Sequence, residues 1–231
     1  MKHYLYLFLF TFALPLAFAE PTASPLKTTV PSDEHYTTRL EYQTAWEDYQ
    51  HVMEGRTTDL IFIGDSITQQ WRWGQGKSIW EKNYAARALD FGQGGDQTQH
   101  TLWRLRNLDI KKYQPKIAVI LIGTNNFQDE LVEIASGVKA VVTTAQEIFP
   151  GIKIVLVSIL PSKRAFDKMN AVNAIIQKYC DDRSVYYLDL ADKFPRQGES
   201  WSGLQKDQLH LTHEGYEVWC TELNKLLARI K

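Results

Sequence analysis

The chain has 231 residues, of which 44% are hydrophobic and 23% are charged, and its formal net charge is −1. This is the composition of an ordinary globular protein with enough apolar material for one core. The near-neutral charge, with both signs interspersed, disfavours a nucleic-acid groove or a polybasic membrane surface and favours a small-molecule partner.

Residues 1–19 have the pattern of a signal peptide. Lys2 precedes an almost wholly apolar run over residues 4–18, and Ala17-Phe18-Ala19 matches a signal-peptidase site. The run is shorter than the roughly 20 residues that a spanning helix needs, which favours cleavage after Ala19 over an uncleaved anchor. We therefore expect an exported protein, periplasmic or secreted, with no transmembrane segment after cleavage.

Residues 20–35 are rich in Pro, Ser and Thr, which predicts an extended leader that passes over the surface or stays mobile. The domain proper is expected over residues 36–231. It opens with a helix over residues 39–55, whose apolar side chains recur every three or four positions.

Short apolar runs then alternate with helical patterns. The tryptophan-rich stretch over residues 71–80 has little clear period, so it is expected to form a loop or short helical turns. Strands are predicted at 60–63, 88–91, 117–122, 152–160 and 185–190, and helices at 98–108, 130–149, 167–182 and 214–230.

This alternation predicts an α/β fold in which helices cover both faces of a parallel sheet. In such folds ligands bind beyond the carboxyl ends of the strands. The turns at Ser66, Gly95 and Asn125 each follow a predicted strand, so they are expected to meet at one edge of the sheet.

Ser66 is the candidate nucleophile, because Gly64-Asp65-Ser66 ends an apolar strand in a sharp turn. Serine needs a histidine base, a group that orients the base, and donors for an oxyanion. Asp207-x-x-His210 offers the first two, since a carboxylate three residues before a histidine in a turn can hold its Nδ1. The alternatives are that Asp207 caps a turn beside a surface histidine, or that His213 is the base.

Four segments in order resemble the four blocks of the SGNH (GDSL-type) hydrolases: Gly64-Asp65-Ser66, Gly94-Gly95-Asp96, Gly123-Thr124-Asn125 and Asp207-x-x-His210. The resemblance covers nearly the whole mature domain. Longer runs, including Phe91 to Asp96 and Leu102-Trp103-Arg104-Leu105, are similar to the catalytic subunits of the intracellular platelet-activating factor acetylhydrolases.

The resemblance implies a flavodoxin-like three-layer α/β/α sandwich with a mostly parallel five-stranded sheet and no cofactor. It makes Ser66 the nucleophile, His210 the base and Asp207 its orienter. The oxyanion would be bound by Gly95 N–H and the Asn125 amide, and Ser66's own N–H would make a third donor.

The implied function is a serine esterase that acts on short acyl esters, acetyl esters foremost, of an acylated sugar or a lysolipid. The alternatives are a lipid esterase like lysophospholipase or platelet-activating factor acetylhydrolase, and a secreted glycan-binding module without turnover. Gly92-Gln93-Gly94-Gly95 also suggests nucleotide binding, but Gln97 stands where the fingerprint needs a third glycine.

Two further expectations concern single side chains. Trp71, in the tryptophan-rich stretch beyond Ser66, and Asn126 are candidates for the wall of a substrate pocket. Cys180 and Cys220 could pair in an oxidising compartment or remain free, and no Cys or His spacing supports a metal site.

Overall fold

The computed structural model describes residues 24–34, 39–56 and 58–230 of the chain. Within these ranges, no helix combines the length and the apolar character needed to cross a membrane. The expected signal peptide, residues 1–19, lies outside the described residues.

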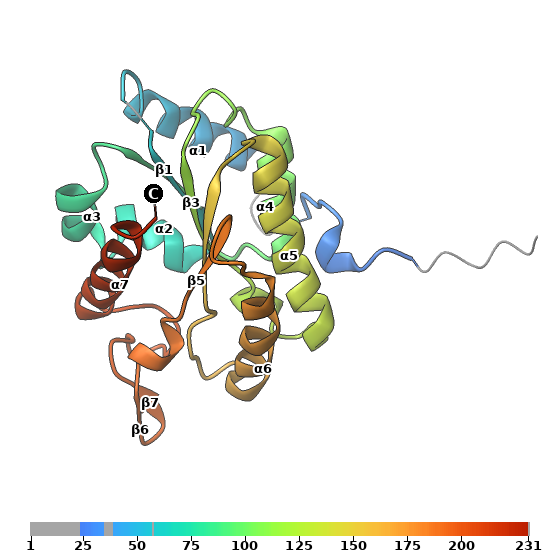
Figure 1. Cartoon of the computed structure of the whole chain (residues 1–231), viewed down its shortest axis with the longest axis vertical. Helices are drawn as coiled ribbons and strands as arrows, with labels where there is room; N and C mark the ends of the chain where they lie inside the picture. The colour runs from blue at the N-terminus through green and yellow to red at the C-terminus, as the bar shows by residue number, and fades with distance from the viewer. Residues whose placement is uncertain (1–23, 35–38, 57, 231) are drawn as a thin grey trace, which may run out of the picture.

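Five parallel strands form the central sheet, in the order β2-β1-β3-β4-β5 (Figure 1). This order and the uniformly parallel pairing confirm the predicted flavodoxin-like topology. The strand next to the candidate nucleophile, β1, lies between β2 and β3, so the loops after these three strands are neighbours. The strands are β1 (Leu60–Gly64), β2 (Ala88–Gly92), β3 (Ile117–Leu121), β4 (Lys153–Val157) and β5 (Val185–Leu188).

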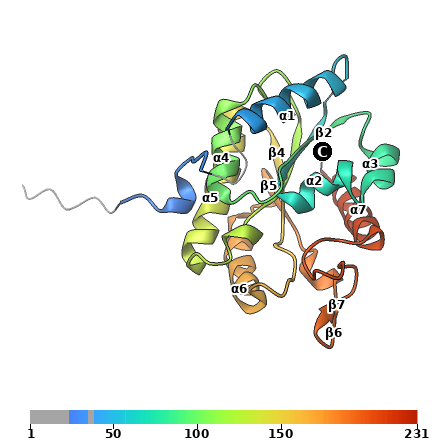
Figure 2. The ribbon, with the colours of Figure 1, turned by 180° about the vertical axis from the view of Figure 1, so that it is seen from behind.

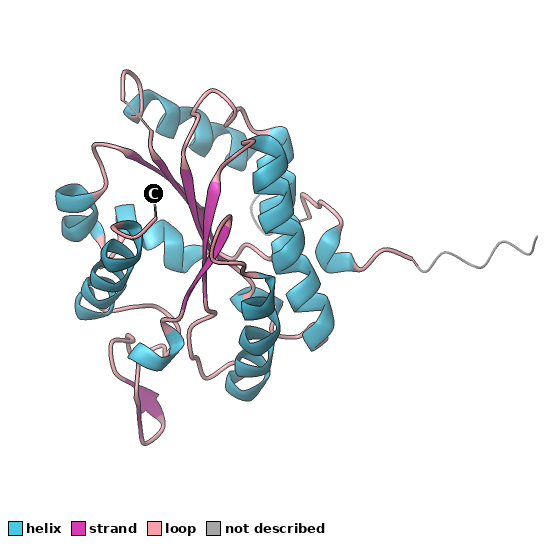
Figure 3. Cartoon of the chain, viewed as in Figure 1, coloured by secondary structure: helices cyan, strands magenta, loops and turns pink. Residues whose placement is uncertain are grey.

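Helices cover both faces of the sheet and complete the predicted three layers, as Figure 3 and the reverse view in Figure 2 show. Each face has its own hydrophobic cluster. The first cluster is covered by α1 (Arg39–Val52), α4 (Thr98–Asn107), α5 (Leu131–Ile148) and α6 (Phe166–Ile176). The second is covered by α2 (Ser66–Trp73), α3 (Lys77–Asn83) and α7 (His213–Leu227).

The second cluster is dominated by aromatic rings. The Phe62 ring of β1 lies 6.0 Å from that of Trp71 and 5.2 Å from those of Trp80 and Tyr84, measured between centroids. Large rings in tilted or edge-to-face contact contribute strongly to core stability. This packing fixes α2, and therefore the turn at its start, against the sheet.

The tryptophan-rich stretch forms two helices, and the first begins at Ser66 itself. The side chain of Asp65 caps α2 by accepting the Ile67 N–H at 2.9 Å. Ile67 and Trp71 lie four residues apart and are both buried, as expected for one helical face. Eight residues hold only two turns, which is too few for the period to stand out in the sequence.

Several element ends differ from the predicted ones. The chain is buried from Ser158 to Leu160 but leaves the strand ladder after Val157, because β5 pairs only as far as Leu188. After Ile176, helix α6 tightens into a 3₁₀ turn, Gln177–Tyr179 (η3). A short hairpin of β6 (Arg196–Gln197) and β7 (Ser200–Trp201) was not predicted.

The described part of the leader, residues 24–34, is held against α4 and α5. It contains a 3₁₀ turn, Lys27–Thr29 (η1), in which Thr28 is fully buried. The Thr28 hydroxyl donates to Glu133 C=O at 2.7 Å, and Thr28 C=O accepts the Thr98 hydroxyl at 2.8 Å. This part of the leader therefore crosses the surface and is fixed at Thr28.

Both cysteines are free thiols. Cys180 packs beside the first hydrophobic cluster and Cys220 belongs to the second, so they lie on opposite faces of the sheet. A disulfide needs Cα atoms within about 7 Å, which this arrangement does not allow.

Candidate active site

Ser66 is the first residue of α2 and follows the carboxyl end of β1. The turn requires glycine at position 64, because a Cβ there would lie 2.3 Å from Leu121 C=O and 2.1 Å from the Thr68 hydroxyl. The Ser66 N–H is at a helix position that has no acceptor within the helix. Both the hydroxyl and the N–H of Ser66 are thus placed at the edge of the sheet.

Ser66, His210 and Asp207 form one hydrogen-bonded chain. Ser66 Oγ lies 2.8 Å from His210 Nε2, and His210 Nδ1 lies 2.6 Å from Asp207 Oδ2. The carboxylate accepts only, so Nδ1 carries the proton and Nε2 is left as the acceptor for the Ser66 hydroxyl. This arrangement can deprotonate Ser66 as it attacks a carbonyl carbon.

Asp207 also organises the loop that carries the histidine. Its Oδ1 accepts the N–H groups of Leu209 at 3.0 Å and His210 at 3.1 Å. Partial burial acts in the opposite direction, but these bonds and the one from the imidazole hold the pKa of Asp207 below its usual value. Asp207 is therefore ionised at neutral pH and oriented from both of its oxygens.

Gln208 adopts the left-handed conformation between Asp207 and His210, with φ of 53°. Its side chain offsets this strain, because Oε1 accepts the Trp201 N–H and Nε2 donates to Gln205 C=O, both at 2.8 Å. The loop is thus anchored to the β6–β7 hairpin.

The loop after β2 brings Gly95 to the same edge. Gly95 has φ of 75°, a conformation that glycine adopts without strain. Within the described part of the chain, no acceptor is bound by the Gly95 N–H. Neighbouring bonds fix the loop: Gln93 N–H donates to Gly64 C=O at 3.0 Å, and Gly94 N–H donates to Gln69 Oε1 at 3.0 Å.

Asn125 lies in the 3₁₀ turn after β3, Thr124–Asn126 (η2). Its Nδ2 donates to Asp96 C=O at 2.9 Å, one residue beyond Gly95. The loops that carry Gly95 and Asn125 are thereby joined directly.

A buried ion pair lies beneath these loops. Arg104 Nη2 is 2.7 Å from Asp96 Oδ2, and both side chains are almost completely buried. The same guanidinium donates to Phe91 C=O at 3.1 Å and to Gly64 C=O at 3.3 Å. Arg104 therefore ties together the carboxyl ends of β1 and β2 and the loop with Gly95.

A model of the GDSL-like lipase/acylhydrolase family matches residues 62–218. The chain belongs to this family. Membership places the protein among ester hydrolases, and the match spans Ser66, Gly95, Asn125, Asp207 and His210.

Curated relatives support the assignment. This acylhydrolase is 32% identical, over 179 residues, to platelet-activating factor acetylhydrolase IB subunit alpha2 of Homo sapiens, with 74% of this chain and 77% of the relative covered. It has the same identity to subunit alpha1 of Rattus norvegicus, covering 74% and 76% of the two chains.

Solved structures share the fold. A GDSL-like lipase of Bacteroides thetaiotaomicron superposes with a TM-score of 0.66 at 19% identity, covering 80% of this chain and 97% of the other. A carbohydrate esterase family 3 structure from Talaromyces cellulolyticus gives 0.56 at 16% identity, covering 75% and 97%.

The pocket roles expected for Trp71 and Asn126 are wrong in this acylhydrolase, because neither side chain reaches solvent. Trp71 packs among the rings of the second cluster. Asn126 is a buried connector: Oδ1 accepts the Thr98 N–H at 3.0 Å, and Nδ2 donates to Asp129 at 2.8 Å. It fixes the start of α4 against the loop with Asn125.

Asp65 stabilises the nucleophile turn. It is fully buried, and burial raises its pKa to about 7, against the opposing effect of the Ile67 N–H. Among the described residues its second oxygen has no hydrogen-bond partner. The bond that Asp65 makes to the Ile67 N–H is the helix cap, so its geometry fits a role in the turn and not proton transfer with His210.

His213, the alternative base, and the question of a metal site remain. His213 Nδ1 lies 3.1 Å from Gln75 C=O and its Nε2 lies 3.7 Å from Glu217, so His213 is engaged away from Ser66. Over the described ranges, no group of three or more His, Cys, Asp or Glu side chains could hold a metal ion.

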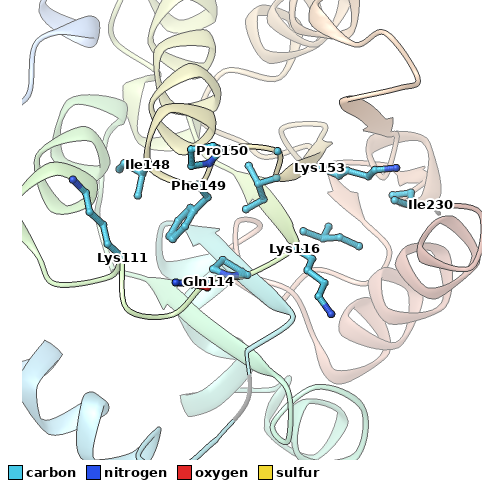
Figure 4. A pocket seen from close by; sticks show the side chains of 12 residues that line it. Lys111, Gln114, Lys116, Ile148, Phe149, Pro150, Lys153 and Ile230 are labelled. Atoms are coloured by element: carbon cyan, nitrogen blue, oxygen red, sulfur yellow. The ribbon is translucent and has the colours of Figure 1, made fainter.

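A pocket of about 640 Å³ opens at the other end of the sheet (Figure 4). It lies at the amino ends of β3 and β4, whereas Ser66 follows a carboxyl end. Figure 4 shows Lys111, Lys116 and Lys153 around Phe149 and Pro150. Its lining holds lysines but no Ser, Cys, His, Asp or Glu side chain, so it lacks a hydroxyl or thiol nucleophile paired with a histidine base and is not the active-site candidate.

The sequence reasoning missed three residues of the site: Arg104, Gln208 and Arg164, whose guanidinium lies 2.7 Å from Asn125 Oδ1. Arg104 stood in a quoted family segment, but only as part of the resemblance. The sequence did carry one signal for Arg104, which is a charged residue within a predicted helix that packs against the core, since a buried charge needs a partner. Neither Gln208 nor Arg164 carries a comparable local signal.

Proposed function

We propose that this acylhydrolase is an exported serine esterase that hydrolyses short-chain acyl esters, acetyl esters foremost, through Ser66, His210 and Asp207. The observation that carries the proposal is the chain of two hydrogen bonds, 2.8 Å and 2.6 Å, from Ser66 to His210 to Asp207. The loops that carry Gly95 and Asn125 are bonded to the same edge of the sheet, which supports the N–H groups of Ser66 and Gly95 and the amide of Asn125 as the oxyanion donors.

In the acylation step, Ser66 Oγ bonds to the acyl carbon while its proton passes to His210 Nε2. The carbonyl electron pair moves onto the oxygen, whose charge is bound by the Ser66 and Gly95 N–H groups and Asn125 Nδ2. The C–O bond to the alcohol then breaks, and the alcohol takes the proton from His210. The Asp207 carboxylate stabilises the imidazolium between these transfers.

Deacylation repeats the sequence with water. Water gives a proton to His210 Nε2 and bonds to the acyl carbon, which again develops an oxyanion. The bond to Ser66 Oγ breaks, Oγ regains the proton from His210, and the carboxylic acid leaves.

The surroundings of Ser66 favour a small acyl group and a polar alcohol. Gln205, in the loop that precedes His210, donates a hydrogen bond from Nε2 to Oε1 of Gln70, on the helix that begins at Ser66, at 3.2 Å. Trp71, which could have formed an apolar wall for a long chain, is in the core. An acetylated sugar fits this polar rim, and a lysolipid fits it less well.

A lipid esterase is the second candidate, because the curated relatives at 32% identity are platelet-activating factor acetylhydrolase subunits. Platelet-activating factor also carries an acetyl ester, so the reaction would be the same. Only the alcohol differs.

The test is a series of p-nitrophenyl esters from acetyl to palmitoyl, with Ser66→Ala of matched thermal stability as control. We expect turnover to fall steeply with chain length and to be absent in the control. Acetylated xylose and platelet-activating factor would then separate the two alcohols. No turnover on any ester would favour the glycan-binding alternative, and turnover by the Ser66→Ala variant would remove Ser66 from the reaction.

Export rests on the sequence of residues 1–19. We expect the mature protein, expressed in a secreting bacterial host, to begin at Glu20 when its N-terminus is sequenced. A protein that retains Met1 in the cytosolic fraction would contradict export and leave the chemistry untouched.

A further inference from the structure

The loop between β4 and α6 touches both halves of the candidate site. Lys163 N–H donates to Gln208 C=O, in the loop of the base, at 3.3 Å. Its neighbour Arg164 donates from Nη1 to Asn125 Oδ1 at 2.7 Å. The loop therefore bridges the two sides of the site, and Arg164 is its contact with an oxyanion donor.

The two partners of the Asn125 amide leave it only one orientation. Arg164 can only donate, so it must face Oδ1, and Asp96 C=O can only accept, so it must face Nδ2. Nδ2 carries two hydrogens, and the bond to Asp96 uses one. The second is thereby left for a ligand, and the amide cannot flip without losing both bonds.

The charge on Arg164 also affects the strength of this donor. A hydrogen bond from a cation is stronger than a neutral one, and it draws electron density toward Oδ1. Bonds in such a chain polarise one another, which strengthens the donor character of Nδ2. The guanidinium carbon lies 5.2 Å from the centroid of the Phe127 ring, a cation–π contact that helps to keep it in place.

We propose that Arg164 is the positioning residue of the oxyanion site, which fixes and polarises the Asn125 amide so that one Nδ2 hydrogen points to the developing charge. The inference rests on the proposed esterase function and names a residue that acts through Asn125 and not on the substrate. Arg164 is exposed, so its effect should be smaller than that of the amide itself.

The first measurement is kcat and KM of Arg164→Ala on p-nitrophenyl acetate. Removing an oxyanion donor costs about 10²–10³ in kcat, so loosening one should cost about tenfold, with KM changed less than about twofold. Arg164→Lys keeps the charge and one donor and should recover part of the loss. A rise in KM with kcat unchanged would overturn the inference, because it would indicate that Arg164 contacts the substrate.

Lys163→Ala is the matched control. It removes the same charge from the same loop, its side chain has no hydrogen bond with a described residue, and the backbone bond to Gln208 remains. We expect its kcat to equal that of the wild type. An equal loss in both variants would overturn the inference in favour of a general charge effect.

A double-mutant cycle with Asn125→Ala gives the decisive result. If Arg164 acts through Asn125, Arg164→Ala should lower kcat about tenfold in the wild type and by less than about twofold in the Asn125→Ala background. An equal fall in both backgrounds would overturn the inference. Thermal melting of all variants excludes loss of fold, and Arg164→Gln, which can still donate to Oδ1, replaces Arg164→Ala if that variant does not fold.

The Ser66→Ala control separates this inference from the proposed function. If Ser66→Ala abolishes turnover, the activity is the proposed one, and an additive cycle overturns only the role of Arg164. If Ser66→Ala retains turnover, the proposed function fails and the inference fails with it.

Discussion

The two ends of the parallel sheet are built differently. At the carboxyl ends, the loops after β1, β2 and β3 are joined by hydrogen bonds through Gly64, Asp96 and Arg104. At the amino ends, the 640 Å³ pocket is lined by two exposed lysines and the half-buried Lys153, over apolar side chains. A pocket of about 630 Å³ also lies beside the base, lined by Gln205, Asp207 and His213, so pocket size does not separate the two ends.

The difference shows that placement, and not volume, distinguishes the candidate site. Attack on an ester needs a nucleophile, a base and donors within hydrogen-bonding distance of one reacting carbonyl. Parallel strands bring such loops together only at their carboxyl ends. If the comparison holds, substitutions at the carboxyl end should change turnover, and comparable changes at the amino end should not.

Asp207→Asn should have the largest effect. Asparagine can still accept the Leu209 and His210 N–H groups, so the loop should stay folded, but the imidazolium loses its charge partner and Nδ1 its fixed proton. We expect kcat on p-nitrophenyl acetate to fall about 10³–10⁴-fold, as on loss of the aspartate in other triads. A fall of less than tenfold, with the melting temperature unchanged, would remove Asp207 from the mechanism.

Arg104→Gln should have the largest effect on stability. It leaves Asp96 buried without its cation, and breaking a buried ion pair costs about 3–5 kcal/mol. The matched control is Lys116→Gln at the amino end, where Lys116 and Asp59 are 3.2 Å apart and exposed. Loss of an exposed pair costs about 0–1 kcal/mol. Urea unfolding checks both, and equal losses would contradict the distinction between the two ends.

Asp65→Asn should change how stability depends on pH. Because burial raises the pKa of Asp65 to about 7, the folded state holds a proton that the unfolded chain releases near pH 4, so wild-type stability falls as pH rises from about 4 to 7. Asparagine keeps the cap and cannot ionise. The unfolding free energy of Asp65→Asn, measured with urea, should therefore gain roughly 1–4 kcal/mol on that of the wild type between pH 4.5 and 8.

A second buried carboxyl with a raised pKa is Asp90, where burial raises it to about 6, but Asp90 is present in both proteins and cancels in this comparison. A difference between Asp65→Asn and wild type that stays constant from pH 4.5 to 8 would show that Asp65 does not titrate in this range.

Lys111→Glu should have the smallest effect. The side chain is exposed at the amino-end pocket, and surface substitutions of this kind stay within about 0.5 kcal/mol. We expect kcat/KM within about twofold of the wild type, because long-range charge effects on a small neutral ester are screened. A tenfold loss would show that the two ends of the sheet are coupled.

The strands could be predicted because buried parallel strands are continuous apolar runs, such as Leu60 to Ile63. Ser66, Asp207 and His210 could be nominated because the spacing of Asp207 and His210 and the turn at Ser66 are local features. The hydrogen bond between Ser66 and His210 joins loops that are far apart in sequence, so it could be seen only once the fold was known.

Other residues could not be placed from sequence for definite physical reasons. Trp71 was expected in a pocket because an indole suits either a core or a ligand, and its burial depends on Phe62 and α7. Arg164 has a long side chain with many rotamers, so its partner is set by the position of Asn125. Glutamine rarely adopts a positive φ, and at Gln208 the cost of this conformation is offset by the side-chain hydrogen bonds to Trp201 and Gln205. The local sequence does not reveal these bonds.

The aromatic cluster beneath the nucleophile has an optical consequence. Trp71, Trp80 and Trp219 are buried within it, and Trp71 lies on the helix that starts at Ser66. Trp73, on the same helix, is 72% exposed. Their fluorescence should therefore separate into emission that iodide cannot quench and emission that it can. With Trp73 replaced by Phe, the remaining tryptophans are all buried, so the protection of their emission from iodide would give a label-free record of whether the core on both faces of the sheet is intact.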